Sequence, residues 1–593
     1  MSEQIVPIRS QPGIKRDGTL FEGDNYVDGR WVRFQRGLPR KMGGYRSINK
    51  FLRGLPRTLH EYTQDQSTYI HAGSANLVER FYIDTSFGTS VITDRTPTSG
   101  FTPDARNLWQ FAVGYDTTNG NQIVAQVAPN RDCICNSQGG ELFIGDLLGT
   151  APLTPVPGAH LPANFNCSGG VIAVPPYTFV YGNDGYVAWS PPNKPGHYTA
   201  SGAGNAHIAS QKIVRGMPLR GGPGSSPSVL FWSADALVRG SYIGGTAVFQ
   251  FDTISTQTSI LSAQSVIEYD GVFYWPGVDR FLMFNGVVRE VENNLNLNFF
   301  FDNLNMDQRQ KVFALKVPRF GEIWWCFPKG SSEEPNHAVV YNVRENTWYD
   351  TPLPNEGRGA GIFPTVFQKP LMSGVQAQNY QVSAAALDAA GTGYTAGDVL
   401  SVVGGDGTVV AEITVNTVTL GAVATFTVTN AGNYTKPPTN PVSVSGGAGV
   451  NAAFDLTFTQ PYKFWVHEVG TDEIDGLNIN PIRSYFETAD ITLPVVAQTS
   501  KALQTLMVEP DFVQAGDMSM VITGRANARA RDVETSPVVF AATPATPQDQ
   551  VLTVKTQRRQ LRFRFESNTL GGDYQMGLCL AHLQPGDGTV VGA

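Results

Sequence analysis

The stretch that decides the fold is Gly321-Glu-Ile-Trp-Trp-Cys-Phe327, followed by His337-Ala-Val-Val-Tyr-Asn342 and Asn346-Thr-Trp-Tyr349. Aromatic and β-branched runs bounded by Gly, Pro and Asn are typical of β-strands joined by turns. Similar strand pairs begin near residues 67, 177, 229 and 271, and the later ones recur at roughly 40- to 50-residue steps. A further unit between residues 104 and 156 fills the gap. Six units therefore span residues 55 to 370.

This recurrence predicts an all-β chain with a β-propeller of about six blades, because propeller blades are four-stranded units of about 40 to 50 residues. A series of β-sandwiches or barrels also produces regularly spaced strands. We favour the propeller because the repeat is sustained and almost no helical periodicity intervenes. The exception is the stretch from Asn293 to Val312, where we expect a short helix.

Length and composition divide the chain further, since 593 residues exceed what one hydrophobic core usually supports. From residue 376 to 459 the sequence becomes rich in Ala, Gly, Thr and Val and nearly loses its charges. Gly393-Tyr-Thr395 and Asn433-Tyr-Thr435 mark two half-repeats there. The clean alternation in Gln560-Leu-Arg-Phe-Arg-Phe-Glu566 predicts a half-exposed strand. We predict an N-terminal segment (1–54), a propeller (55–375), an inserted β domain (376–459), and return strands with a β-sandwich (460–593).

Charge and targeting signals restrict the function. The net charge of -8 disfavours general DNA binding. The start of the sequence has no secretory pattern, and no apolar run is long enough to span a membrane, so we expect neither a signal peptide nor a membrane segment. The five cysteines are scattered and odd in number, which fits a reducing cytoplasm. Cys133-Ile-Cys135 is too closely spaced for the usual zinc pattern.

Enzyme signatures are absent from the sequence. It contains no phosphate-binding loop, no HExxH zinc motif, no nucleophile elbow and no dinucleotide fingerprint. Asp472, Glu473 and Asp475 lie together but lack the ligand order of a calcium loop, so we interpret them as a polar turn. We therefore expect no enzyme activity, no metal and no cofactor.

Three passages resemble the tail hub, or nozzle, proteins of short-tailed bacteriophages, which are related to packaged-DNA stabilisation proteins. They are Ile8–Gly18 with Tyr26–Phe34 and Gly37–Tyr45, His467–Gly470 through Pro481–Asp490, and Arg562–Ser567 with Gly571–Gly577. The passages frame the predicted propeller, whereas the 376–459 insert departs from the smaller members of the family.

The resemblance implies a virion tail protein made and assembled in the host bacterial cytoplasm. Such a subunit forms a ring, expected to be a hexamer, below the portal and adaptor. It extends the channel for double-stranded DNA, helps to retain and eject that DNA, and anchors fibres or spikes. An alternative class of function is a virion-associated protein that binds or degrades host polysaccharide.

The segment from Arg30 to Arg57 holds nine basic residues and no acidic one. An acidic surface on a neighbouring ring subunit would offset such a concentration of charge. DNA phosphates, or a solvated loop with arginines stacked on aromatic rings, are the other interpretations. We therefore expect surface assembly contacts at these candidates: Arg30, Arg33, Arg36, Arg40, Lys41 and Arg46.

Overall fold

The computed structural model describes residues 3–19, 24–64, 67–83, 92–99, 108–128, 142–163, 165, 167–220, 226–365, 367–491, 502–526, 530–543, 551–558 and 560–586. Nearly all regular structure in these residues is β-strand, so the chain is all-β. Their helical elements are α1 (Leu297–Asn303) and the 3-10 turns η1 (Gly158–His160), η2 (Asn183–Gly185) and η3 (Met306–Lys311). Helix α1 and η3 lie in the stretch where a short helix was expected. No helix of the described chain is long and apolar enough to cross a membrane.

Two compact units make up the chain. The first comprises Met1–Ile48, Arg57–Met372 and Trp465–Ala593, and the second comprises Asn49–Pro56 and Ser373–Phe464. The second unit contains the whole segment 376–459 and extends a few residues beyond it at both ends.

Within the first unit, the described residues form six successive four-stranded sheets, each made of strands adjacent in sequence. Sheet 1 contains β8 (Pro56–Gln64), β9 (Ser67–Ser74), β10 (Val78–Ile83) and β11 (Thr93–Asp94). Sheet 2 contains β12 (Leu108–Asp116), β13 (Gly120–Ala128), β14 (Leu142–Asp146) and β15 (Thr154–Pro155). Sheet 3 contains β16 (Gly170–Val174), β17 (Tyr177–Tyr181), β18 (Tyr186–Trp189) and β19 (Gly204–His207).

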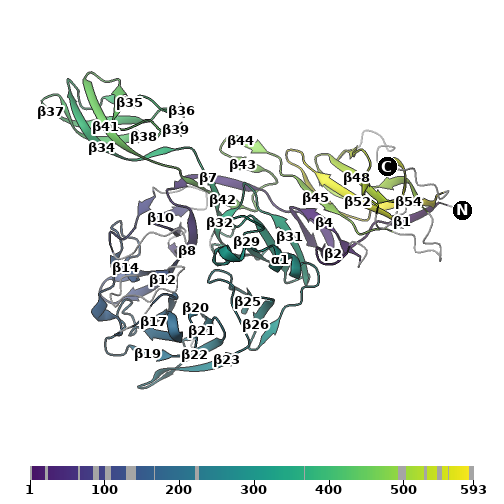
Figure 1. The fold of residues 1–593 in the computed structure, drawn as a ribbon, viewed down its shortest axis with the longest axis horizontal. Coiled ribbons are helices and arrows are strands. Elements are labelled where there is room, and N and C mark those ends of the chain that lie inside the picture. The colour runs from purple at the N-terminus through teal and green to yellow at the C-terminus, as the bar shows by residue number, and fades with distance from the viewer. Residues whose placement is uncertain are drawn as a thin grey trace. The chain divides into compact units, whose positions relative to one another are not determined.

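The next three sheets have the same construction. Sheet 4 contains β20 (Ile213–Pro218), β21 (Ser228–Ser233), β22 (Leu237–Gly244) and β23 (Val248–Ser255). Sheet 5 contains β24 (Ile267–Tyr269), β25 (Val272–Pro276), β26 (Phe281–Phe284) and β27 (Val288–Glu290). Sheet 6 contains β28 (Phe313–Val317), β29 (Glu322–Phe327), β30 (His337–Asn342) and β31 (Thr347–Pro352). The six sheets are arranged around a common centre (Figure 1).

Each of these sheets packs on the next through aromatic and branched side chains. Trp232 of sheet 4 lies against Trp275 of sheet 5, with ring centroids 5.6 Å apart at 76°. Phe281 of sheet 5 lies 5.0 Å from Trp325 of sheet 6. Burying such large rings between sheets is the main source of stability in this region.

Ion pairs connect the first and the last of the six sheets. Arg57 in β8 forms a bidentate ion pair with Glu334, which lies between β29 and β30. Lys311 contacts the same carboxylate at 2.9 Å. These contacts connect the beginning and the end of the six-sheet series.

The strands that decide the fold are the second strands of their sheets. The runs starting near residues 177, 229, 271 and 321 correspond to β17, β21, β25 and β29. The second strands have a partner on each side, and most of their residues are buried. Outer strands such as β27 are more exposed and carry a weaker apolar signal.

The two ends of the chain fold together in the first unit. Two sheets join N-terminal and C-terminal strands. The first has the order β1 (Gln4–Pro7), β54 (Leu580–Pro585), β46 (Leu503–Glu509) and β51 (Leu552–Arg558). The second has the order β47 (Phe512–Ala515), β53 (Asp573–Met576), β6 (Leu38–Lys41) and β5 (Val32–Gln35). A third has β4 (Asp28–Arg30), β45 (Ser484–Glu487), β52 (Gln560–Ser567), β48 (Met518–Arg525) and β49 (Val533–Glu534), with β50 (Val538–Phe540) beside β48. Their shared core contains Tyr26, Phe34, Phe486 and Phe565.

The chain forms two further sheets. Strands β2 (Gln11–Ile14) and β3 (Asn25–Tyr26) form a short parallel pair. A six-stranded sheet has the order β32 (Arg358–Ile362), β33 (Leu371–Ala377), β42 (Tyr462–His467), β7 (Tyr45–Leu52), β43 (Glu473–Asp475) and β44 (Asn478–Asn480). The chain enters the second unit along β33 and leaves it along β42.

The second unit is a six-stranded sheet with internal pseudo-symmetry. Its order is β34 (Gln381–Thr392), β41 (Val450–Thr459), β40 (Val442–Ser445), β35 (Val399–Val402), β37 (Glu412–Thr419) and β38 (Ala422–Asn430). Exchanging β34 with β38, β35 with β40 and β37 with β41 gives the same order in reverse. The short pair β36 (Asp406–Val409) and β39 (Asn433–Lys436) lies beside it. The two half-repeats of the sequence therefore correspond to two structural halves.

Candidate functional site

Two of the three passages that carry the family resemblance meet around one buried arginine. Arg33, in β5, has a side chain that is only 1% exposed. Its Nε lies 2.8 Å from Glu322 Oε1 in sheet 6, and its Nη2 lies 2.5 Å from Glu468 Oε1, just after β42. The guanidinium also stacks 3.7 Å from the ring centroid of Phe320. One side chain thus holds three distant parts of the first unit together.

Burial and ion pairing together set the pKa values of Arg33 and Glu322 in this cluster. Burial alone would lower the pKa of Arg33, but the carboxylates of Glu322 and Glu468 outweigh it and hold the pKa above its ordinary value. Burial raises the pKa of Glu322, although Arg33 and hydrogen bonds from Trp324 and Tyr349 oppose this. A charge pair of this kind is costly to break, because the remaining ion stays buried without a partner.

A second cluster lies on the neighbouring strands. Arg358 is fully buried and donates from Nε to His467 Nε2 at 3.1 Å. Its guanidinium lies 5.4 Å from the Tyr45 ring and 5.3 Å from the Trp465 ring. Burial, and then Arg358, lower the pKa of His467 well below its usual range. His467 is therefore neutral and accepts the hydrogen bond from Arg358. The cluster stabilises the packing of these neighbouring strands.

The third passage joins the same region. Ser484 and Tyr574 share a hydrogen bond of 2.8 Å between their hydroxyl oxygens, and the hydroxyl of Ser484 also contacts the carbonyl of Trp31 at 2.9 Å. Lys41 Nζ donates to the carbonyl of Gly572 at 2.7 Å. All three passages thus contribute to one packed assembly, although more than 400 residues of sequence separate the first from the other two.

The structure corrects the expected surface position of two candidate assembly residues. Arg33 is buried as described, and Lys41 is only 2% exposed. Burial lowers the pKa of Lys41, and Asp472 and Asp573 oppose this. For Arg33, Glu322 and Glu468 of the same chain therefore supply the compensation that we had assigned to a neighbouring subunit.

The other candidates are more accessible. Arg30, Arg36 and Arg46 are exposed, and Arg40 is half-buried and donates to Gln35 at 2.8 Å. Arg36 and Gly37 have φ values of 54° and 75° and form the two-residue turn between β5 and β6, as a tight hairpin with positive φ at both positions requires. The Glu345 carboxylate accepts from the backbone N–H groups of both turn residues.

The candidate metal sites receive no support as ligand clusters. Asp475 accepts from Ser47 at 2.8 Å, Glu473 from Tyr45 at 3.4 Å, and Asp472 from the N–H of Gly571 at 2.8 Å. Among the residues that the structure describes, no group of three potential ligands could hold a metal ion. Cys133 and Cys135 lie outside the described residues.

The sequence did not predict a buried basic cluster that lies in sheets 1, 2 and 4. His60 and His71 lie on neighbouring strands with ring centroids 6.5 Å apart, and both are about 6 Å from Phe111. Burial and Arg215 lower the pKa of His60 to about 4. The two histidines are eleven positions apart in the sequence, and no spacing rule would have paired them.

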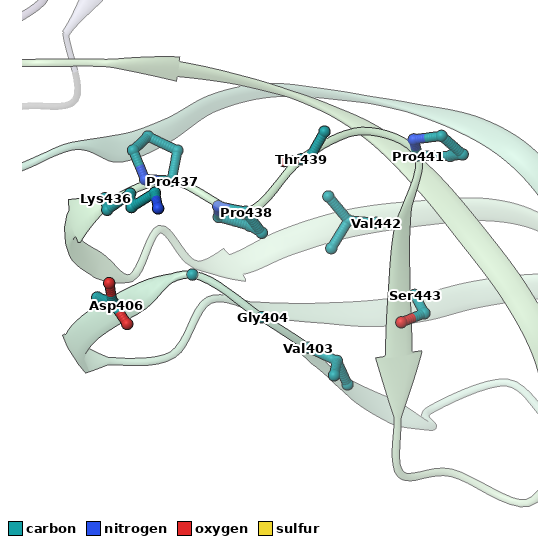
Figure 2. A pocket seen from close by; sticks show the side chains of 11 residues that line it. Val403, Gly404, Asp406, Lys436, Pro437, Pro438, Thr439, Pro441, Val442 and Ser443 are labelled. Atoms are coloured by element: carbon teal, nitrogen blue, oxygen red, sulfur yellow. The ribbon is translucent and has the colours of Figure 1, made fainter.

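The second unit contains a pocket of about 380 Å³. One wall is the turn from Val403 to Asp406, and the other is the segment from Lys436 to Ser443. In Figure 2, Lys436 and Asp406 lie at one end and Ser443 lies towards the other. This volume is within the range of small-molecule sites.

The chain was compared with protein families, curated proteins and solved structures. No protein-family model matches the chain. No curated protein matches it either. Among solved structures, the chain is similar to a puromycin hydrolase, with a TM-score of 0.31 and 10% identity over 56% of this chain. The match covers 51% of the hydrolase chain, so this chain spans about half of its length.

Proposed function

We propose that the protein is a structural subunit of a bacteriophage tail, namely a ring-forming hub that extends the DNA channel below the portal and adaptor. In this proposal the six sheets are the blades of a β-propeller, and the sheets that join the two ends of the chain form a β-sandwich platform. The subunit has no catalytic role. It helps to retain packaged DNA and anchors fibres or spikes.

The observation that carries the proposal is the convergence of the three resembling passages. Arg33 and Trp31 from the first meet Glu468 and Ser484 from the second, and Ser484 reaches Tyr574 of the third. Their convergence supports a shared platform that a ring could be built from.

A second function, saccharide binding by the inserted unit, is favoured by the pocket between the Gly404–Gly405 turn and the proline-rich wall. The two functions are compatible, because binding a host glycan and forming a ring use different parts of the chain.

The ring is tested by measuring the mass of the purified chain alone and after mixing with its adaptor ring. A closed cyclic assembly, expected to contain six copies, supports the proposal. A chain that stays monomeric with the adaptor, or a trimer that releases reducing sugar from host envelopes, contradicts it.

A further inference from the structure

The inserted unit departs from its own pseudo-symmetry at one place, and the pocket lies there. Between the Tyr-Thr marker and the next strand, the first half has only Ala396-Gly397-Asp398, whereas the second half has Lys436-Pro-Pro-Thr-Asn-Pro441. The second connection is longer and contains three prolines. The connection that lines the pocket is therefore where the two halves differ.

In the first half, the short connection is held against a neighbouring glycine turn. The Asp398 carboxylate accepts from the N–H of Thr395 at 2.9 Å and from the N–H of Ala448 at 3.0 Å, which ties the connection to the neighbouring glycine turn. A Cβ added to Gly447 would lie 3.0 Å from the Asp398 side chain.

The proline segment of the second half faces a glycine turn of the same shape, which belongs to the first half. Gly404 and Gly405 have φ values of 99° and 73°, against 98° and 72° for Gly446 and Gly447. A Cβ on Gly405 would come within 2.8 Å of Pro438, so glycine is needed for this close approach. The prolines restrict the backbone, so the far wall is preorganised before any ligand binds.

Two charged side chains, those of Asp406 and Lys436, line the pocket. Asp406 and Lys436 face each other across the β36–β39 pair, and both are exposed. Within the described part of the chain, neither side chain makes a hydrogen bond or an ion pair. A carboxylate and an ammonium group therefore remain available at one end of a pocket whose sides are formed by pyrrolidine rings and two valines.

We propose that this pocket binds a pyranose unit of a glycan, an inference that rests on the saccharide binding proposed above for the inserted unit. The Asp406 carboxylate accepts hydrogen bonds from two vicinal hydroxyls, and Lys436 donates to a ring or hydroxyl oxygen. The C–H faces of the sugar pack on the prolines and on Val403, while Ser443 and Thr439 offer further hydroxyls.

The test uses the full-length chain and ligand-observed saturation-transfer NMR. The probes are the methyl glycosides of glucose and galactose, N-acetylglucosamine and glucuronic acid. We expect transfer to at least one of them, and we expect Asp406→Asn and Lys436→Gln each to weaken that binding by about tenfold. Asp455→Asn, an exposed carboxylate on β41 of the same unit, is the matched control and should bind as the wild type does.

Absence of transfer to all four sugars overturns the inference, as does equal binding by the wild type and both pocket variants. Thermal unfolding of each variant separates loss of binding from loss of folding, and an added variant, Thr439→Trp, abolishes binding by filling the pocket if the site is correct. These readouts do not depend on ring formation, so failure of the hub proposal and failure of the glycan site are distinguishable.

Discussion

Tyr394 and Tyr434 make the same hydrogen bond in opposite halves of the inserted unit. The Tyr394 hydroxyl accepts from the N–H of Ala452 at 3.3 Å, and the Tyr434 hydroxyl accepts from the N–H of Ala411 at 2.8 Å. Both rings are at least 97% buried. Each half therefore places its tyrosine in the core and satisfies a backbone donor of the other half, which makes the unit interdependent.

Replacing either tyrosine by phenylalanine should destabilise the inserted unit. The ring would still fill its space, but a buried N–H would lose its acceptor, at a cost of about 1–3 kcal/mol. Hydrogen exchange should quicken at Ala411 in Tyr434→Phe and at Ala452 in Tyr394→Phe, with the six sheets unchanged. Unaltered exchange at both alanines would contradict this assignment.

Deleting residues 376–459 and joining Val375 to Gln460 should leave a soluble protein. The inserted unit has its own core, which contains Leu400, Ile413 and Phe454, so its removal does not open the core of the first unit. The measurement is soluble yield together with cooperative unfolding. A product found only in aggregates would mean that the boundary is wrong.

Arg33→Met should destabilise the first unit by about 3–5 kcal/mol, because Glu322 and Glu468 would remain buried without their cation. Arg36→Met is the matched control, since Arg36 is exposed at the turn of the same hairpin. Denaturant unfolding of the two variants gives the comparison. Equal stability of both variants would show that the cluster contributes nothing.

Acidification from pH 7 to pH 5 should destabilise the protein. The pKa values of His60, His71 and His467 are lowered by burial, to about 4 for His60, from an ordinary value of 6.5. The unfolded chain binds protons in this range and the folded chain does not, so stability is lost as the pH falls below about 6.5. His60 alone accounts for up to about 3 kcal/mol once the pH reaches its folded pKa.

The check is the melting temperature measured across that range for the wild type and for His60→Phe, which removes one titrating group beside Phe111. The variant should have a shallower loss on acidification. Identical profiles for the two proteins would contradict a neutral, buried His60.

The exposed part of the basic segment should act in assembly. We expect the double variant Arg30→Glu with Arg36→Glu to bind the partner ring more weakly, and we expect wild-type binding to weaken as salt rises. Arg239→Glu, an exposed arginine on β22, is the control. If docking is normal but filled heads lose DNA, the segment acts on DNA, and if neither changes it is only a solvated surface.

The sequence predicts the class of the fold well because the buried second and third strands have strong aromatic signals. Trp324 and Trp325 in β29 or Tyr177 and Phe179 in β17 leave little alternative to strand. Exposed outer strands such as β27 were not predicted, since their residues are ordinary for turns and loops. The two half-repeats of the insert were visible because Tyr394 and Tyr434 occupy equivalent core positions.

The site was less predictable from the sequence. A run of basic residues from Arg30 to Arg57 has the same appearance whether its side chains face solvent or carboxylates of the same chain. Arg33 is buried because Glu322 and Glu468, 289 and 435 positions away, converge on it. The pocket depends on two loops that approach across the β36–β39 pair, and no local pattern records that approach.

The measurement that tests the central claim most directly is an electron-microscope image of assembled particles in which this chain carries a label in its inserted unit. The account predicts labels around the tail axis below the portal, six to a ring, and tails that lack this ring when the chain is absent. Labels confined to fibre tips, or particles without label that still have complete tails, would contradict a ring-forming hub.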